Sequence, residues 1–434
     1  MFYRALSSPP PAGAARKSVL ISAQLIIKST HHRTEDMDSN TIPQYKDTSF
    51  DIPQSHAHRH PMMKIRTVEP FILHVPIQQK TISDASNTIS HWGVVGAKII
   101  TNTGIVGYGY TGTHAELAGD QAIAHVIGAS FGPLLKGENP LEVNALWHKM
   151  FNYAPVRWIG RSGIAHLAIG AIDVALWDIK AKSAEQPLWQ FLGGATTDVL
   201  EAYNTDIGWI SNPLESLITQ SSVAVHEQGF RRLKLKVGHA NPADDIVRIA
   251  AVRKAVGPSI AIAVDANGKW DLPTAMRFCK LAEDLDVFWL EEPLWFDDPE
   301  SHRKLCEASS IPIALGEQLY SIDAFAQFIS SNAMRYAQPD VTRLAGISEY
   351  LRTADLAYGY RMPVAAHVGD MGQVHVHLSF YHEMTTMLEY IPWIKHCFED
   401  PIRVENGLYA KPQSPGAGTT LLKNSMEEFG KPLM

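Results

Sequence analysis

From about Leu200 onward, the chain alternates short strand-like runs with amphipathic helical patterns, and this alternation constrains the fold more than any other feature. The strand candidates are residues 200–203, 233–237, 260–264, 287–290, 313–315, 336–338, 363–366 and 385–388. Repeated strand–helix units favour a parallel sheet, and eight of them favour a closed barrel. A doubly wound open sheet is the alternative, but the glycine-rich phosphate-binding turn expected after one of its strands is not found.

The sequence before this region has a different pattern. Residues 63–112 predict an antiparallel meander, in which Asn102-Thr103-Gly104 marks a hairpin turn. Helical patterns follow at residues 115–130, 141–152 and 163–182. We therefore predict an α+β capping domain over residues 63–190 and a barrel over residues 191–399, with residues 400–434 packing back onto the cap.

The first 62 residues differ from the rest of the chain, because Met1 to Thr34 contain no acidic residue, several basic residues and frequent serines. We interpret this segment as a disordered extension. The alternative is an organellar transit peptide, since such peptides are rich in arginine and serine and poor in acidic residues.

Composition restricts the classes of partner. The chain has 38 basic and 45 acidic residues, a net charge of −7, which argues against binding to nucleic acid or a membrane surface. No apolar run is long enough to span a membrane. The three cysteines form no CxxC pair, which indicates a reducing compartment; we expect a cytoplasmic protein, with the transit peptide left open.

Three predicted strands end in a carboxylate. Asp265, Glu291 and Glu317 follow one another at intervals of 26 residues, one strand–helix unit each. In a barrel these strand ends would meet at the same rim, where three unpaired carboxylates repel one another. A hard divalent cation removes that repulsion, and oxygen ligands suit Mg²⁺. A lone carboxylate at a strand end is usually a helix cap, but three in phase predict a magnesium site.

The preceding strand carries Lys234 and Lys236, which alternation places on one face with leucines on the other. If that face points into the barrel, both ammonium groups lie beside the cation. Repulsion, desolvation and the cation would then lower a lysine pKa, so that a neutral amine could act as a base. The alternative, an edge strand with a solvated lysine face, is disfavoured by its apolar flanks.

Polar side chains also end the later strands. Asp340 and His367 follow the sixth and seventh candidates, and a carboxylate beside an imidazole fixes its tautomer and raises its basicity. Glu389 ends the eighth candidate. We interpret His375 and His377, in a following helix, as structural.

Together, Lys-x-Lys, Val-Asp-Ala-Asn, Trp-Leu-Glu-Glu-Pro, Gly-Glu, Gln-Pro-Asp and Ala-Ala-His resemble, in order and spacing, the mandelate racemase/muconate lactonizing enzyme family of the enolase superfamily. The similarity covers about residues 63–422. It implies a modified TIM barrel of the (β/α)7β type and a superfamily chemistry in which a Lys or His base works with Mg²⁺. By this resemblance, Asp265, Glu291 and Glu317 would ligate Mg²⁺, and Lys236 and the His367–Asp340 pair would face the substrate from opposite sides.

The resemblance also assigns supporting roles. Glu389 would hydrogen-bond the enediolate formed when the proton beside a carboxylate is removed, and Lys234 would add positive charge. Fragments such as Ser83-Asp84-Ala85 and Tyr203-Asn204-Thr205 are similar to acid-sugar dehydratases, particularly those acting on talarate and galactarate. The candidate substrate contacts are Asp84, Asn204, Asn267 and Arg161, with Lys80 and Asn87 as further cap-loop candidates.

These features leave three functions open. We expect a dehydratase of an aldonic or aldaric acid, giving a 2-keto-3-deoxy acid. A racemase, epimerase or cycloisomerase would use the same metal and bases, and a non-catalytic family member is the third alternative. Ala345-Gly346 stands where the family usually has paired glycines, and the cap loop matches poorly, which leaves the exact carboxylate substrate open. By resemblance, a homo-oligomer, either a dimer or an octamer, is expected.

Overall fold

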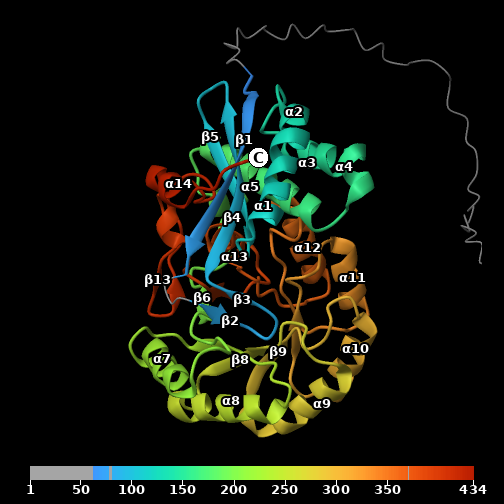
Figure 1. Ribbon diagram of the computed structural model, residues 1–434, viewed down its shortest axis with the longest axis vertical. Coiled ribbons are helices and arrows are strands. Elements are labelled where there is room, and N and C mark those ends of the chain that lie inside the picture. Colours follow the sequence, from blue (N-terminus) through green and yellow to red (C-terminus); the bar gives the residue numbers. More distant parts are fainter. Residues whose placement is uncertain (1–61, 78–80, 370) are drawn as a thin grey trace, which may run out of the picture. The chain divides into compact units, whose positions relative to one another are not determined.

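The computed structural model describes residues 62–77, 81–369 and 371–434, which form an α+β cap and a parallel barrel (Figure 1). The extension predicted for residues 1–62 lies, apart from Met62, outside the described residues, as does Lys80. None of the helices in these residues has both the length and the apolarity needed to cross a bilayer.

The cap contains the predicted meander. Its sheet has the order β1-β4-β5, with antiparallel pairing throughout. The elements are β1 (Ile65–Pro76), β4 (His91–Thr101), β5 (Val106–Thr113), α1 (Leu117–His125), a π-helical turn (Val126–Phe131), α2 (Gly132–Leu135), α3 (Val143–Phe151), α4 (Ala154–Ile159), α5 (Ile164–Ser183) and α6 (Leu188–Phe191). Between β1 and β4 the chain also forms a small hairpin of β2 (Ile82–Ser83) and β3 (Thr88–Ile89).

Helix α5 packs directly on β5. Most of its side chains are apolar and buried, as expected for a helix enclosed on several sides. Gly107 and Gly109 of β5 allow the close approach, because a Cβ atom on Gly109 would lie 2.1 Å from the carbonyl oxygen of Ala171.

The second part of the chain is the barrel. Its strands are β6 (Glu201–Asn204), β7 (Arg232–Lys236), β8 (Ala261–Asp265), β9 (Val287–Glu291), β10 (Ile313–Leu315), β11 (Tyr336–Ala337) and β12 (Met387–Tyr390). Its helices are α7 (Leu214–His226), α8 (Pro242–Val256), α9 (Leu272–Leu281), α10 (Pro299–Ala308), α11 (Ile322–Ser330), α12 (Ile347–Gly359) and α13 (Gly372–Tyr381).

Neighbouring barrel strands pair in parallel from β6 to β11, and β12 pairs in parallel with β6. The predicted strand at residues 363–366 is reduced to single bridges from Val364 to Ala337 and to Thr385. These pairings lead around from β6 to β12 and back to β6. A proline at position 363, which has no N–H to donate, limits further pairing there.

The C-terminal segment returns to both parts. Strands β13 (Val404–Glu405) and β14 (Leu408–Tyr409) form a hairpin, and β14 pairs antiparallel with β6. Farther on, α14 (Lys423–Phe429) precedes Lys431, whose N–H donates to the carbonyl of Ile72 in β1. The segment therefore contacts the barrel first and the cap last.

Candidate active site

The lysine strand shows which side chains enter the barrel. Leu233 and Leu235 of β7 belong to the hydrophobic core between strands and helices, whereas Lys234 and Lys236 are buried on the opposite face. Lys234 shares its register with Ala263, which packs inside the barrel against Trp289. The sequence prediction of an inward lysine face therefore agrees with the structure.

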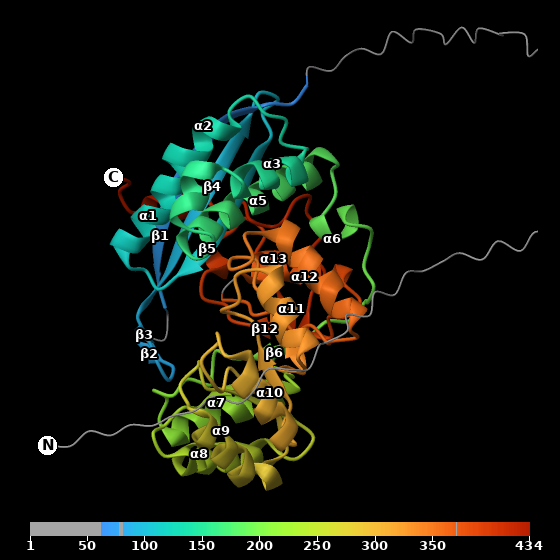
Figure 2. The same cartoon turned by 90° about the vertical axis from the view of Figure 1, so that its right-hand side faces the viewer.

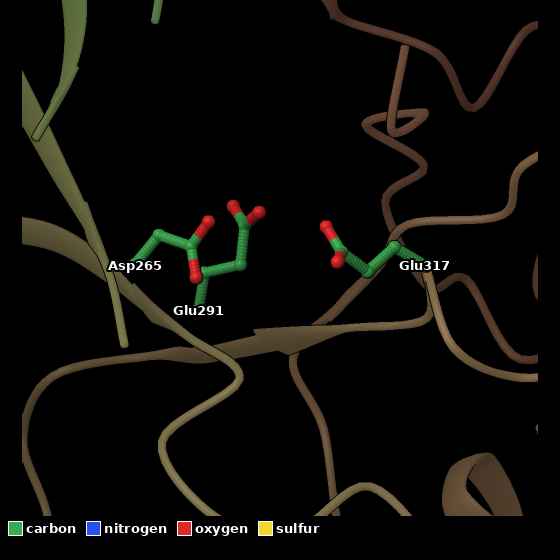
Figure 3. A group of neighbouring side chains, drawn as sticks. All are labelled: Asp265, Glu291 and Glu317. Carbon is green, nitrogen blue, oxygen red and sulfur yellow. The ribbon is translucent and has the colours of Figure 1, made fainter. Parts of the chain in front are cut away.

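The three evenly spaced carboxylates converge, as Figure 3 shows. Asp265, Glu291 and Glu317 each offer one oxygen, and these oxygens all lie within 4.8 Å of one another. Glu291 also accepts hydrogen bonds at Oε2 from Trp289 Nε1 (3.1 Å) and Gln338 Nε2 (2.6 Å). All three carboxylates are buried, so their mutual repulsion is poorly screened.

Ion pairs with the lysines offset that repulsion. Lys234 Nζ lies 2.5 Å from Glu291 Oε1 and 2.8 Å from Glu389 Oε1. Lys236 Nζ lies 2.5 Å from Asp265 Oδ2. Burial would raise the pKa of Asp265, but Lys236 and Lys234 outweigh it and hold that pKa below its ordinary value. Burial raises the pKa of Glu291 to about 7, against the opposing effect of Lys234.

The pKa of Lys236 was predicted to fall beside a cation, and the side chains by themselves act in the opposite direction. Burial is the largest single effect and lowers the pKa of Lys236, but the carboxylates of Asp265, Glu317 and Asp84 together outweigh it, so the pKa is raised above its ordinary value rather than lowered. Repulsion, desolvation and the cation were all counted in that prediction, but the ion pair with Asp265 was not. A neutral Lys236 therefore requires that a cation engage the Asp265 carboxylate.

The histidine lies at the other end of the carboxylate group. His367 Nδ1 is 2.7 Å from Asp340 Oδ2, and His367 Nε2 is 3.0 Å from Glu317 Oε2. Although burial alone would lower it, the pKa of His367 is raised to about 9 by Glu317 and by the hydrogen bond with Asp340. Asp340 is itself oriented by the N–H of Thr342, which donates to its Oδ1 at 2.7 Å.

Glu389 is the last inward carboxylate. Thr205 Oγ1 donates to its Oε1 at 2.6 Å, and the N–H of Val368 donates to its Oε2 at 2.9 Å. Burial would raise the pKa of Glu389, but Lys234 and His367 outweigh it, so the pKa lies well below its usual range. Glu389 is therefore an ionised group at the same rim.

The β2–β3 hairpin brings the cap to this rim (Figure 2). The N–H of Ile210 donates to the carbonyl of Ser83 at 2.9 Å, and Ser86 Oγ donates to the carbonyl of Asn267 at 3.4 Å. Asp84 lies at the tip of the hairpin, where it accepts hydrogen bonds from the N–H groups of Ser86 and Asn87, both at 2.7 Å. The structure thus brings Asp84, Asn87 and Asn267 together beside the site.

Two predicted substrate contacts lie elsewhere. Asn204 pairs with Leu233 of β7 and Tyr390 of β12, so its side chain is on the outer face of the barrel. Arg161 is exposed between α4 and α5, and within the described residues it makes no hydrogen bond or ion pair with the site. A match of short fragments does not say which face of a strand a side chain occupies, and the register gives Asn204 the outer face.

Glu292 is a site residue that the sequence reasoning missed. It is 2% exposed, its Oε1 has no hydrogen-bond partner among the described residues, and Asp265, Glu291 and Glu317 all act on its pKa. Strand alternation would point Glu292 away from the barrel interior, but its φ of 37° breaks the strand geometry. The Glu-Glu-Pro sequence was the available signal.

The donor set fits Mg²⁺. Three convergent carboxylates supply hard oxygen ligands, and the nearby nitrogens belong to lysines whose charge is already paired with them. The buried oxygen of Glu292, which lacks a donor, is a further acceptor next to this cluster.

We expect Glu292→Gln to stabilise the metal-free protein increasingly as pH rises. Burial and neighbouring carboxylates hold the pKa of Glu292 well above 4.5, so the folded state keeps a proton that the unfolded state loses. Below the unfolded-state pKa both states hold the proton, and the contribution of Glu292 to the free energy of unfolding has its full value. It falls by about 1.4 kcal/mol per pH unit until the folded-state pKa is reached. Urea unfolding in a chelator, at acidic and neutral pH, measures the difference between variant and wild type. A difference that does not grow with pH would contradict the assignment.

Comparison with known proteins places this site in a family. Residues 67–193 match the N-terminal domain of the mandelate racemase/muconate lactonizing enzymes, and residues 217–425 match the enolase C-terminal domain-like model. L-talarate/galactarate dehydratase of Salmonella typhimurium is 35% identical over 359 residues, covering 81% of this chain and 88% of the relative. The chain belongs to the mandelate racemase/muconate lactonizing enzyme family. The resemblance inferred from its motifs is confirmed.

Further relatives in the family differ in reaction. Arabinonate dehydratase of Saccharolobus solfataricus is 31% identical, covering 77% of this chain and 90% of the relative. A 3,6-anhydro-alpha-L-galactonate cycloisomerase of Streptomyces coelicolor is 29% identical, covering 82% and 97%. The Salmonella dehydratase, liganded with Mg and L-lyxarohydroxamate, has a solved structure with a TM-score of 0.79 at 33% identity, covering 86% of this chain and 94% of that chain.

Proposed function

We propose that this protein is a Mg²⁺-dependent dehydratase of an aldonic or aldaric acid. One observation carries the proposal: the two candidate acid–base groups flank the carboxylate cluster. Lys236 contacts Asp265 at one end, and His367 contacts Glu317 at the other. A substrate carboxylate held at the cluster would present its α-carbon between an amine and an imidazole. The similarity to talarate/galactarate and arabinonate dehydratases supports this reaction.

Each side chain then has a defined task. Asp265, Glu291 and Glu317 would hold Mg²⁺, which when bound supplies positive charge against the negative charge developing on the substrate carboxylate. Lys236 takes the proton from the α-carbon. Lys234 adds positive charge beside Glu291. His367, held by Asp340, gives its proton to the departing β-hydroxyl, which leaves as water.

With the same two groups the protein could instead be a racemase, epimerase or cycloisomerase of a carboxylate substrate. The cycloisomerase relative supports this second candidate. Incubation of the Mg²⁺-loaded protein with a panel of aldonic and aldaric acids separates the reactions. A 2-keto-3-deoxy product, trapped as a semicarbazone, supports dehydration. Solvent deuterium in the recovered acid without a keto product supports epimerisation, and no reaction with any acid would contradict both for that panel.

We expect Asp340→Asn to move the alkaline limit of activity to lower pH. His367 must carry a proton to expel the hydroxyl, and Asp340 helps to raise its pKa to about 9. Losing the carboxylate charge should lower this limit by about one pH unit or more. Since Mg²⁺ on Glu317 weakens the other contribution, the wild-type limit should lie at or below 9. The pH profile of kcat is the measurement, and an unchanged alkaline limb would remove His367 as the acid.

A further inference from the structure

A cavity lies outside the barrel, beside the loop that joins β6 to α7. It measures about 550 Å³ and is bounded by β6, by α7 and by the chain that follows β12. After β12 the described chain continues with a short 3-10 turn (Lys395–Cys397) and the β13–β14 hairpin instead of a barrel helix. Within the described residues β12 is therefore followed by irregular chain and a hairpin, and the cavity lies between these and α7.

Asn204 lines this cavity with an unsatisfied group. Its side chain shares the outer face with Tyr390, its register partner on β12. Asn204 is 3% exposed, and its Oδ1 accepts no hydrogen bond from the described residues. A buried amide oxygen without a donor costs about 1–3 kcal/mol. A molecule in the cavity recovers that cost if its donor reaches this oxygen, which has almost no exposure to solvent.

The lining chemistry limits what that molecule can be. Carboxylate oxygens come from Glu227 and from Asp206, whose Oδ1 also accepts from Trp393 Nε1 at 2.7 Å, whereas no lysine, arginine or histidine is among the lining residues. A sugar acid would therefore meet carboxylates without a compensating cation. Phe230 and Tyr390 place their rings 5.4 Å apart on the same wall. A ligand that suits this lining has hydroxyl groups to donate to the acceptors and an aliphatic face to pack on the rings. A neutral polyol or sugar has both, and the volume suits a small ligand.

The loop of residues 205–213 connects this cavity with the active site. Asp206 lines the cavity, while Thr205 donates to Glu389. The N–H of Lys236 donates to the carbonyl of Gly208 at 2.7 Å, and Lys236 Nζ lies 5.4 Å from the centre of the Trp209 ring. A ligand that shifts this loop therefore acts on groups that contact Lys236 and Glu389.

We propose that this outer cavity binds a neutral polyol or sugar and that its occupancy raises the rate of the barrel reaction through the loop of residues 205–213. The proposed binding does not depend on the proposed function, whereas the proposed effect on the rate rests on it. Differences in coupling between two sites commonly amount to about fivefold or more, so we expect a rise of about fivefold in kcat/KM.

The binding test uses galactitol and D-galactose as probes, titrated at millimolar concentration into the Mg²⁺-loaded full chain and followed by calorimetry. We expect binding to wild type and to Lys236→Ala, and binding about tenfold weaker or absent in Asn204→Leu and in Gln220→Leu. Asn424→Leu, an exposed change on α14, is the matched control and should bind as wild type does. Circular dichroism identifies a variant that fails to fold, and the two cavity variants are on different elements.

The results separate this inference from the proposed function. No heat with either probe, binding retained in both cavity variants, or binding lost in Lys236→Ala would overturn the cavity site. If the probes bind there but leave kcat/KM for an accepted acid unchanged, the coupling is overturned. If no acid is dehydrated, the proposed function and the rate half fail, while the titrations still decide whether the cavity binds polyols.

Discussion

Lys236→Ala should abolish turnover while the protein remains folded in the presence of Mg²⁺. Lys236 is the basic group next to Asp265, and a positioned general base accounts for about 10²–10⁴-fold of a rate. The loss should appear in kcat and equally in exchange of the α-proton with solvent deuterium, because both require the same abstraction. Steady-state kinetics and proton NMR of the recovered acid provide the two measurements.

The matched control for this variant is Lys280→Ala, which removes an exposed lysine from α9. It should retain wild-type kinetics. In Lys236→Ala, Asp265 keeps a second cation, since Lys234 Nζ lies 3.6 Å from Asp265 Oδ2. The fold should therefore survive, and full activity in a folded Lys236→Ala protein would exclude this lysine as the base.

Much of the site could be predicted because strand ends in a barrel share one rim. Even spacing was enough to predict that Asp265, Glu291 and Glu317 meet, and strand alternation was enough to predict that both lysines point inward. Strand alternation gives the wrong direction for Glu292, because its positive φ departs from strand geometry. Sequence patterns describe regular backbone, so residues in irregular conformations at functional sites are the ones they miss.

The pKa of Lys236 and the docking of the cap hairpin could not be predicted from the sequence for another reason. Whether the pKa of Lys236 rises or falls depends on a 2.5 Å contact with Asp265, and spacing gives no such distances. The placement of Asp84 depends on the hairpin contact between Ser83 and Ile210, residues more than a hundred positions apart. Asn204 shows the reverse case, in which a similar fragment predicted a contact and the strand register assigned its side chain to the other face.

Removing divalent cations should abolish turnover without unfolding the protein. Metal stabilisation of developing charge is worth several kcal/mol, so activity in a chelator should fall by about a thousandfold or more. The fold should persist because Lys234 and Lys236 pair with the carboxylates that would hold the cation. Mg²⁺ at about one hundred times its dissociation constant should raise the free energy of unfolding by about 2.7 kcal/mol. Activity and urea unfolding, each measured with and without added Mg²⁺, test both halves. Full activity in the chelator would contradict the assignment of the metal.

The affinity for Mg²⁺ should also depend on pH in a direction set by Glu291. Burial raises the pKa of this carboxyl group to about 7, so below that pH the cation must displace a proton to bind. Affinity should therefore fall by up to about tenfold per pH unit below 7, and binding should release a proton there. Calorimetry in buffers of different ionisation enthalpy measures both quantities. The exposed variant Glu300→Gln should show the same pH dependence as wild type, whereas Glu291→Gln should bind weakly at every pH because it lacks the charged ligand. An affinity that stays constant as pH falls below 7 would mean that Glu291 is already ionised before the cation arrives, and that the lysines dominate its charge state.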